Sequence, residues 1–272
     1  MQRSVLIQRW GGIGDVIMIL PVACNLVRPR YHKQGMLVTF EGLEEDRGWM
    51  QHYFPQLQYL ATNHGNRTQD FSKYDYVLEF DQYNDQFDTV LAGYGSPTIN
   101  AQELFCVEAA WNRLPYPRAD QLSPSFWIDR APSRREESLL FTKASCVART
   151  MSEVASSQLM GSHKFTRKNP RYQTRLELFQ AISQARLVVA PDTGVIHIAE
   201  MFKTPWVCLH NTFSNASRHK HYKHGLCVQS KVPCSPCFLH GGCGNQICKE
   251  AYDTTELKQA IERALSAVPR TG

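Results

Sequence analysis

The 272-residue sequence contains no uninterrupted apolar run close to the roughly 18 residues that a membrane-spanning helix needs. A short apolar run near the start ends at Gln8 and Arg9, so we expect no secretory signal and a cytoplasmic protein. No charge of one sign dominates, because 30 Lys and Arg against 25 Asp and Glu give a net charge of only +5. This balance allows anionic ligands without requiring nucleic acid. With 43% hydrophobic and 20% charged residues, the composition excludes a disordered chain.

Strand and helix patterns alternate along the chain in two rounds. In the first round, β-type apolar runs predict strands at Ser4–Gln8, Met36–Phe40, Leu57–Leu60 and Tyr76–Phe80. In the second round they predict strands at Ser138–Thr142, Leu187–Ala190 and Pro205–His210. Helices are expected near Asp15, over Ala101–Arg113, weakly near Cys146–Leu159, over Thr174–Ala185, from about Val195 and from Asp253.

The two rounds are separated by a segment from Asn112 to Pro132 that contains four prolines. We therefore expect a first domain at residues 1–130 and a second at residues 131–272. The alternation predicts an α/β fold of two Rossmann-like, doubly wound domains with parallel sheets, facing each other across a cleft. Ligands are expected in that cleft, at the carboxyl ends of the strands.

A glycine-rich turn follows the first predicted strand, with Gly11, Gly12 and Gly14 leading directly to Asp15. The turn lacks the Gly-Lys-Ser/Thr ending of a P-loop, and Ile17 stands where a dinucleotide-binding fingerprint has its third glycine. Two interpretations remain. Either Asp15 only caps the following helix, or the turn delivers its carboxylate to the edge of a cleft.

A second turn, Asp192-Thr193-Gly194, ends a predicted buried strand and begins a helix. The N–H groups of the first helical turn, the Thr193 hydroxyl and the Gly194 backbone could bind an anion. His197 lies in the same first turn, and its side chain leans toward the helix N-terminus. A bound diphosphate would favour the protonated imidazole there. The alternative is an ordinary capped helix with a half-buried histidine.

Further polar residues in loops suit contact with phosphate. Ser145 and Arg149 place a hydroxyl and a guanidinium in the loop that follows the strand opening the second round. A solvated arginine is the ordinary alternative. Two basic loops are interpreted as solvated loops or as a surface for an anionic ligand or polymer; they contain Lys164, Arg167, Lys168, Arg171 and Arg175, then His219, Lys220, His221, Lys223 and His224.

The sequence has nine cysteines, which without an export signal indicate reduced thiols or a metal site rather than disulfides. Four of them have the spacing Cys234-x2-Cys237-x5-Cys243-x4-Cys248 within a cysteine-rich loop at residues 227–248. Such spacing can complete a tetrahedral, structural site for zinc or iron, and unligated cysteines are the alternative. Cys227 is a further candidate thiol, and the cysteines expected in the core are Cys24, Cys106, Cys146 and Cys208.

Taken together, these motifs resemble the heptosyltransferase-type glycosyltransferases of family 9. Gly14-Asp15-Val16 followed by Leu20-Pro21 is similar to the opening Gly-Asp and Leu/Thr-Pro pattern of that family. The run from Asp192 to Ala199 resembles its Asp-Ser/Thr-Gly-x-x-His-Leu-Ala signature, and Ser145 to Arg149 resembles its Thr-x-x-x-Lys phosphate loop with arginine in place of lysine. The four-cysteine loop is similar to that of a subset that includes protein heptosyltransferases holding iron there.

The sequence also departs from the family pattern. The chain is shorter than usual, and the tract from Gly161 to Gln173 replaces a strand–helix unit of the nucleotide-binding half. Met151 stands where an aromatic residue is expected.

The resemblance implies the two-domain GT-B fold, in which residues 1–130 bind the acceptor and residues 131–272 bind the nucleotide sugar. It also implies an inverting transfer of a sugar from a nucleotide-diphosphate donor, such as ADP-heptose, to a hydroxyl of a saccharide or protein. Asp15 would take the proton of the acceptor hydroxyl, and Asp192 would orient its turn or bind sugar hydroxyls. The leaving diphosphate would be stabilised, without a catalytic divalent cation, by Ser145, Arg149, Thr193, Gly194 and His197.

Two other functions stay open at this point. The first is a DNA-modifying glycosyltransferase of viral type, with DNA as its acceptor, whose basic loops would follow the phosphate backbone. The second is a non-enzymatic, zinc-stabilised nucleic-acid-binding module centred on Cys234–Cys248. That second function leaves Asp15 and the turn from Asp192 to His197 unexplained.

Overall fold

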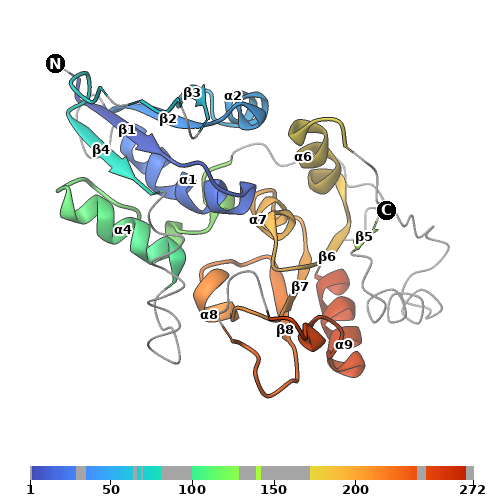
Figure 1. Ribbon diagram of the computed structural model, residues 1–272. Helices are drawn as coiled ribbons and strands as arrows, with labels where there is room; N and C mark the ends of the chain where they lie inside the picture. Colours follow the sequence, from blue (N-terminus) through green and yellow to red (C-terminus); the bar gives the residue numbers. More distant parts are fainter. Residues whose placement is uncertain are drawn as a thin grey trace.

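The computed structural model of the protein describes residues 2–28, 35–63, 66–68, 70–80, 100–128, 139–141, 172–237 and 243–267. Its strands form two four-stranded sheets, and each described strand pair is parallel (Figure 1). The predicted α/β class with parallel sheets is thus confirmed. The predicted domain boundary between residues 130 and 131 and the predicted helix near Cys146–Leu159 lie outside the described residues.

The first sheet has the strand order β3-β2-β1-β4, with β1 at Ser4–Gln8, β2 at Leu37–Leu43, β3 at Gln58–Thr62 and β4 at Tyr76–Glu79. Its helices are α1 (Ile13–Val27), α2 (Arg47–Tyr53) and α4 (Ala101–Trp111), and short 3-10 turns η1, η2 and η3 lie at Glu44–Asp46, Ala119–Gln121 and Pro124–Phe126. We call residues 2–128 the first half.

The second sheet has the strand order β5-β6-β7-β8, with β5 at Leu139–Phe141, β6 at Leu187–Pro191, β7 at Trp206–His210 and β8 at Gly225–Gln229. Its helices are α6 (Arg175–Gln184), α7 (Gly194–Met201), α8 (Asn215–Arg218) and α9 (Thr254–Ser266), and the 3-10 turn η4 lies at Ile247–Lys249. We call residues 139–267 the second half.

Strand β2 continues beyond its predicted end at Phe40, through a buried acidic residue. The Glu41 carboxylate accepts hydrogen bonds from Gln8 Nε2 at 2.8 Å and from Thr62 Oγ1 at 3.0 Å. A charged residue usually marks the end of a buried strand, but here hydrogen bonds from β1 and β3 stabilise the Glu41 carboxylate. These partners are invisible to a local pattern, which explains the short prediction.

Helix α9 has the start and the buried face that its sequence predicts. Asp253 is its N-cap, and its carboxylate accepts hydrogen bonds from the N–H groups of Thr255 and Glu256. The apolar face of the helix is buried against the second sheet through Leu257, Ala260, Ile261, Ala264 and Leu265. Amphipathic spacing was sufficient for this prediction because one face of the helix alone carries apolar residues.

The two halves share one hydrophobic core. Helices α1 and α7 are in contact, and α7 lies between α1 and the second sheet (Figure 1). Trp49 of α2 stacks on Phe179 of α6 with ring centroids 4.6 Å apart, and Tyr53 meets Phe202 at 4.9 Å. The sequence predicts a cleft between two domains, whereas α1 and α7 pack directly against each other. No described helix is long and apolar enough to span a membrane.

Candidate active site

The N-terminal turns of α1 and α7 meet between the two sheets, and glycine is required where they touch. A Cβ atom on Gly14 would lie 2.6 Å from Cδ2 of His197, and one on Gly194 would lie 2.2 Å from Cγ2 of Ile13. Side chains at these positions would collide with the opposite helix. The glycine-rich turn of the first half and the Asp192-Thr193-Gly194 turn of the second half are therefore brought together, although they lie far apart in the sequence.

Asp15 lies in the first turn of α1, directly after this contact. Gly12 is the N-cap residue and provides no side-chain cap, so Asp15 is not the cap that the sequence left open as an alternative. Its carboxylate lies 3.3 Å from Nη2 of Arg9, and its side chain is 25% exposed whereas that of Arg9 is 1% exposed. Arg9 packs against Gly11 and donates through Nη1 to the Phe80 carbonyl at 2.6 Å. The buried guanidinium of Arg9 thus fixes one side of the Asp15 carboxylate, and part of that carboxylate stays exposed to solvent.

Helix α7 begins without a side-chain cap. Thr193 is its N-cap residue in an extended conformation, and the Thr193 hydroxyl donates to the Pro191 carbonyl at 3.2 Å. The positive end of the α7 dipole therefore lies next to the equivalent end of α1. Two helix N-termini in contact favour a negatively charged ligand at this position.

His197 is buried in the first turn of α7 and is neutral. Burial, then the positive charges of His219 and Arg218, lower its pKa to about 3, although Asp192 acts in the opposite direction. Its Nδ1 lies 2.5 Å from the hydroxyl of Tyr222. When that phenol donates to Nδ1, the imidazole proton is on Nε2, the nitrogen on the side of Asp192 and Gly14. The imidazole is therefore neutral, in contrast to the protonated form expected beside a diphosphate.

Asp192 is surrounded by basic side chains. Its carboxylate oxygens lie 3.4 Å from Nε2 of His219, 3.9 Å from Nε2 of His197 and 4.0 Å from Nε of Arg218. Burial opposes ionisation, but His219, His197, His210 and Arg218 together lower the pKa of Asp192. The ionised carboxylate thus holds the strand-to-helix turn and the following loop together, which fits an orienting role.

The basic residues from His219 to His224 are only partly solvated: Lys220 and Lys223 are exposed, whereas the three histidines are buried or half-buried. Lys220 and His221 both contact Oε1 of Glu103 on α4, each at 2.8 Å. His224 lies 3.0 Å from the buried Glu200 carboxylate, and His219 is only 2% exposed. These charges are used in contacts within the protein, so they offer no support for a DNA-tracking surface.

Other candidate residues fall beyond the part that the structure describes or away from the site. Ser145 and Arg149 lie outside the described residues, as do Lys164, Arg167, Lys168 and Arg171. Arg175 pairs with Glu45 at 2.6 Å and also with Asp46, so it joins α6 to the first half. Its positive charge is therefore not part of the α1–α7 contact region.

The four-cysteine loop follows β8. Cys234 is exposed, and Cys237, Cys243 and Cys248 are half-buried. The N–H groups of Gln246 and Asn245 bond to the Cys243 sulfur and lower its pKa. Burial, then the sulfurs of Cys237, Cys243 and Cys234, raise the pKa of Cys248. The sulfurs of Cys237, Cys243 and Cys234 thus act on Cys248 electrostatically, but the four sulfurs are not among the groups of described residues whose ligand atoms all lie within 4.8 Å of one another.

The remaining cysteines are mostly buried, as their apolar surroundings predict. Cys24, Cys106 and Cys208 are buried, and Cys146 lies outside the described residues. Cys227 is half-buried on β8. A hydrogen bond with Cys208 lowers its pKa to about 4; burial opposes this shift, and hydrogen bonds with His210 and His219 support it.

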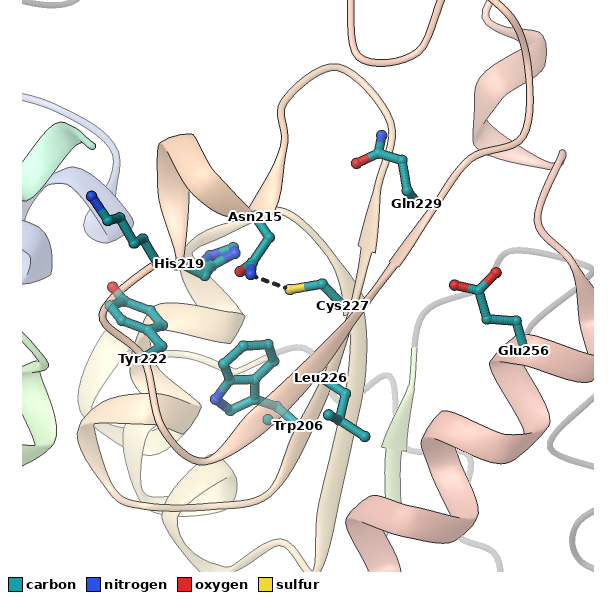
Figure 2. A pocket seen from close by; sticks show the side chains of 10 residues that line it. Trp206, Asn215, His219, Tyr222, Leu226, Cys227, Gln229 and Glu256 are labelled. Carbon is teal, nitrogen blue, oxygen red and sulfur yellow. Dashed lines mark hydrogen bonds between the residues drawn. The ribbon is translucent and has the colours of Figure 1, made fainter. Parts of the chain in front are cut away.

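A pocket of about 320 Å³ lies beside β8 (Figure 2). Its wall includes His219, Tyr222 and Cys227, and the Cys227 side chain points from β8 toward Asn215, whose Oδ1 lies 3.2 Å from Sγ. Trp206 forms another part of the wall. Through Tyr222, which bonds to His197, this pocket adjoins the turn that carries Asp192.

Three residues of this region were not identified from the sequence as partners of the predicted site. Arg9 appeared only as the end of an apolar run, Tyr222 carried no motif, and His219 was interpreted as part of a basic loop. The position of an arginine at the end of the first predicted strand, two residues before Gly11, is the one local signal that could have indicated Arg9. Tyr222 and His219 reach the site through tertiary contacts alone.

Comparison with known proteins agrees with this geometry. Residues 170–244 match the family model described as glycosyltransferase family 9 (heptosyltransferase). The structure of E. coli heptosyltransferase WaaC with ADP is similar, with a TM-score of 0.60 and 12% identity over 96% of this chain and 99% of that one. A family 9 glycosyltransferase from Veillonella parvula gives 0.61 and 12% over 98% of each chain.

A third similar structure is the iron-containing dodecameric glycosyltransferase TibC from enterotoxigenic E. coli, with a TM-score of 0.61 and 12% identity. The similarity covers 98% of this chain and 77% of the TibC chain. The comparison with curated proteins found no match.

The family match and the fold define the class of protein: the chain is a glycosyltransferase, an enzyme of sugar transfer. Within that class it resembles the heptosyltransferases of family 9, as its motifs predicted. At 12% identity, the solved structures establish the parallel α/β architecture and leave the substrates to be argued from the site.

Proposed function

We propose that this protein is an inverting glycosyltransferase that moves a sugar from an ADP-heptose-like donor to a hydroxyl of a saccharide or protein. The observation that carries the proposal is the contact between Gly14 and Gly194, which puts the carboxylate-bearing turn of α1 beside the N-terminus of α7. A solved structure of WaaC that resembles this chain contains ADP, and a resembling structure of TibC contains an ADP-heptose. The donor assignment follows from these likenesses and from the family motif at Asp192–His197.

In this proposal Asp15 is the general base. Its carboxylate accepts the proton of the acceptor hydroxyl while that oxygen bonds to the anomeric carbon, and the bond from that carbon to the diphosphate oxygen breaks. Arg9 orients the Asp15 carboxylate from the protein interior, since the Arg9 guanidinium is buried and donates a hydrogen bond to the backbone carbonyl of Phe80. The exposed fraction of Asp15 leaves room for an acceptor on the outer side.

The leaving diphosphate is stabilised from the second half. In this proposal the uncapped N–H groups at the start of α7 stabilise the developing negative charge, and the Thr193 hydroxyl exchanges its bond to the Pro191 carbonyl for one to the diphosphate. His197 contributes as a neutral donor through Nε2–H, with its orientation fixed by Tyr222. Ser145 and Arg149 are proposed to complete this set, on the strength of the family resemblance. Asp192 holds the turn through its histidine contacts.

The two-domain organisation is part of the proposal. Residues 1–130 form the acceptor-side domain and residues 131–272 the nucleotide-sugar domain, with the substrates meeting in a cleft beside the α1–α7 contact. The arrangement of one parallel sheet in each half supports this division.

We also propose a structural zinc or iron ion at Cys234, Cys237, Cys243 and Cys248. The spacing of the four cysteines supports this proposal, and the N–H groups of Asn245 and Gln246, which bond to the Cys243 sulfur, would orient that ligand. The four sulfurs would have to move closer together to bind one ion. The ion would hold the loop after β8 in shape and would take no part in the transfer.

A panel of nucleoside diphosphates tests the proposal most directly. ADP, present at about 100 times its dissociation constant, should raise the free energy of unfolding by about 2.7 kcal/mol, measured as a shift in Tm. His197→Ala should weaken this effect because it removes a donor to the diphosphate. His52→Ala, at an exposed histidine of α2, is the control and should keep the full shift. A wild-type protein whose Tm responds to no nucleoside diphosphate would contradict the proposal.

A further inference from the structure

A group of cysteine and histidine side chains lies where β7 and β8 run side by side. None of these residues belongs to the four-cysteine loop. Cys208 of β7 stands directly opposite Cys227 of β8 in the parallel register. His210 lies two residues after Cys208, so both side chains are on the same face of β7. His219, which follows α8, completes the group. Ligand atoms of Cys208, His210 and His219 all lie within 4.8 Å of one another.

The spacing of these atoms fits a single metal ion. Nδ1 of His219 lies 3.0 Å from Nε2 of His210. Two nitrogens bound to one tetrahedral zinc at about 2.0 Å are separated by about 3.3 Å, so a small shift suffices. Cys227 interacts through its side chain with Cys208, His210 and His219; its sulfur lies outside the group whose ligand atoms are all within 4.8 Å of one another, and a shift toward that group would make it the fourth ligand. Two sulfurs and two imidazoles are a common ligand set for structural zinc.

The burial of the group also favours an ion. His210 is 0% exposed and His219 is 2% exposed, so an ion held by their imidazoles would be shielded from solvent. Two thiolates would neutralise a divalent cation, so the occupied site would carry no net charge and could be buried at little electrostatic cost.

The contact between His219 and Asp192 would orient His219 as a metal ligand. When Nδ1 of His219 binds the metal, its Nε2–H faces Oδ1 of Asp192 at 3.4 Å. A carboxylate behind a ligating histidine is the usual way in which proteins orient such a ligand. The ion would thereby be connected to the turn that precedes α7.

We propose that Cys208, His210, His219 and Cys227 form a structural zinc site that braces the Asp192 turn. The pocket beside β8 gives solvent access to it, because both His219 and Cys227 line that pocket (Figure 2). The two thiols lose their protons to solvent when the ion binds. This inference stands on the side-chain geometry and does not depend on the transfer reaction proposed above.

Metal analysis of loop-deficient protein tests the site. The variant C234S/C237S of the full chain removes two ligands of the four-cysteine loop, so any remaining zinc reports on the β7–β8 group. After loading with zinc and desalting, this background should retain one ion per chain by elemental analysis. Adding Cys227→Ser should reduce the metal content at least tenfold. Adding Cys106→Ser, at a buried cysteine of α4, is the matched control and should leave it unchanged.

Cobalt spectroscopy keeps the test decisive if Cys227→Ser fails to fold. In the same background, Cys227→His offers a nitrogen in place of a sulfur, so Co²⁺ should still bind with roughly half the thiolate-to-metal absorption. The proposal is overturned if the folded background binds no metal, or if Cys208→Ser and Cys227→Ser retain it. A Cys208–Cys227 disulfide, found without reductant by a mass two hydrogens lower and located by peptide mapping, would also overturn it.

Discussion

At the scale of single residues, the pair formed by Arg9 and Asp15 shows how a reactive carboxylate is positioned. The arginine is almost completely buried, whereas the aspartate keeps a quarter of its surface exposed. The carboxylate is thus anchored on one side and open to a second substrate on the other. Its position in the first turn of α1 is fixed by backbone bonds to Gly12, because the N–H of Asp15 donates to the Gly12 carbonyl at 2.9 Å.

Asp15→Asn is expected to lower the rate of sugar transfer by about 100-fold or more, because the amide cannot accept the proton of the acceptor hydroxyl. Affinity for ADP, measured by calorimetry, should remain unchanged. Asp120→Asn removes an exposed carboxylate from η2 and serves as the control, with full activity expected. Wild-type transfer by the Asp15→Asn enzyme would exclude Asp15 as the base.

The sequence predicted the turn at Asp192–His197 because strand, turn and helix signals coincide there within a few residues. It could not predict the state of His197, since burial by α1 and the neighbouring His219 come from distant segments. Arg9, Tyr222 and the partners of Asp192 were missed for the same reason. Local sequence patterns can thus locate the turn that carries these residues, whereas the protonation state of His197 depends on tertiary contacts.

At the scale of elements, two glycines let α1 and α7 approach more closely than any other residues would allow. Each glycine faces atoms of the opposite helix at less than ordinary van der Waals distance once a Cβ is added. Glycine inside a helical turn lowers helix stability, so its use here indicates that the close approach matters more than helix propensity.

Gly194→Ala is expected to destabilise the protein by about 1–3 kcal/mol, because the added methyl would lie 2.2 Å from Ile13 Cγ2. Urea unfolding monitored by circular dichroism gives the free energy of unfolding. Gly48→Ala is the matched control on α2, where an added Cβ meets nothing within 4 Å. That change should stabilise the protein by up to about 1 kcal/mol through helix propensity. Equal effects at the two positions would show that the α1–α7 contact tolerates a side chain.

The elements themselves were largely predictable, and the exceptions are instructive. The strands at β1, β4, β6 and β7 and helix α9 follow from apolar runs and a capping residue. Strand β2 was predicted too short because Glu41 is satisfied by residues of other strands. The arrangement of strands into two sheets follows from the alternation, whereas the direct packing of α1 on α7 does not.

At the scale of the whole molecule, buried polar contacts join the two halves in addition to the shared hydrophobic core. Glu200 of α7 is fully buried and accepts hydrogen bonds from Ser123 Oγ at 2.5 Å and from Trp206 Nε1 at 3.0 Å. Asn100 Nδ2 donates to the Ser217 carbonyl at 3.3 Å. Pairs so distant along the chain leave no local pattern, so the sequence could not predict these contacts.

The stability of the whole chain is expected to decrease in acid because of Glu200. Burial alone would raise its pKa, but His224, Ser123 and Trp206 together lower it below the ordinary value of 4.5. The unfolded chain therefore takes up a proton before the folded one, so this stability is complete above about pH 4.5 and is lost as the pH falls further. The loss amounts to about 1.4 kcal/mol for each pH unit between the two pKa values.

Thermal unfolding followed from pH 7 to pH 3 measures this effect. Glu200→Gln should lower Tm at pH 7, because the amide replaces a charged acceptor in a buried network, at a cost of about 1–3 kcal/mol. The same variant should show a weaker decrease in Tm below pH 4.5 than the wild type. Parallel pH profiles for the two proteins would show that Glu200 does not control acid stability.

The contact between Gly14 and Gly194 also limits how the enzyme can move. Two residues without side chains meet there, and Trp49 stacked on Phe179 joins the halves at a second point. Held at both points, Asp15 and the Asp192 turn keep a fixed separation. An acceptor substrate would then reach Asp15 from its solvent-exposed side, without a rearrangement of the two helices.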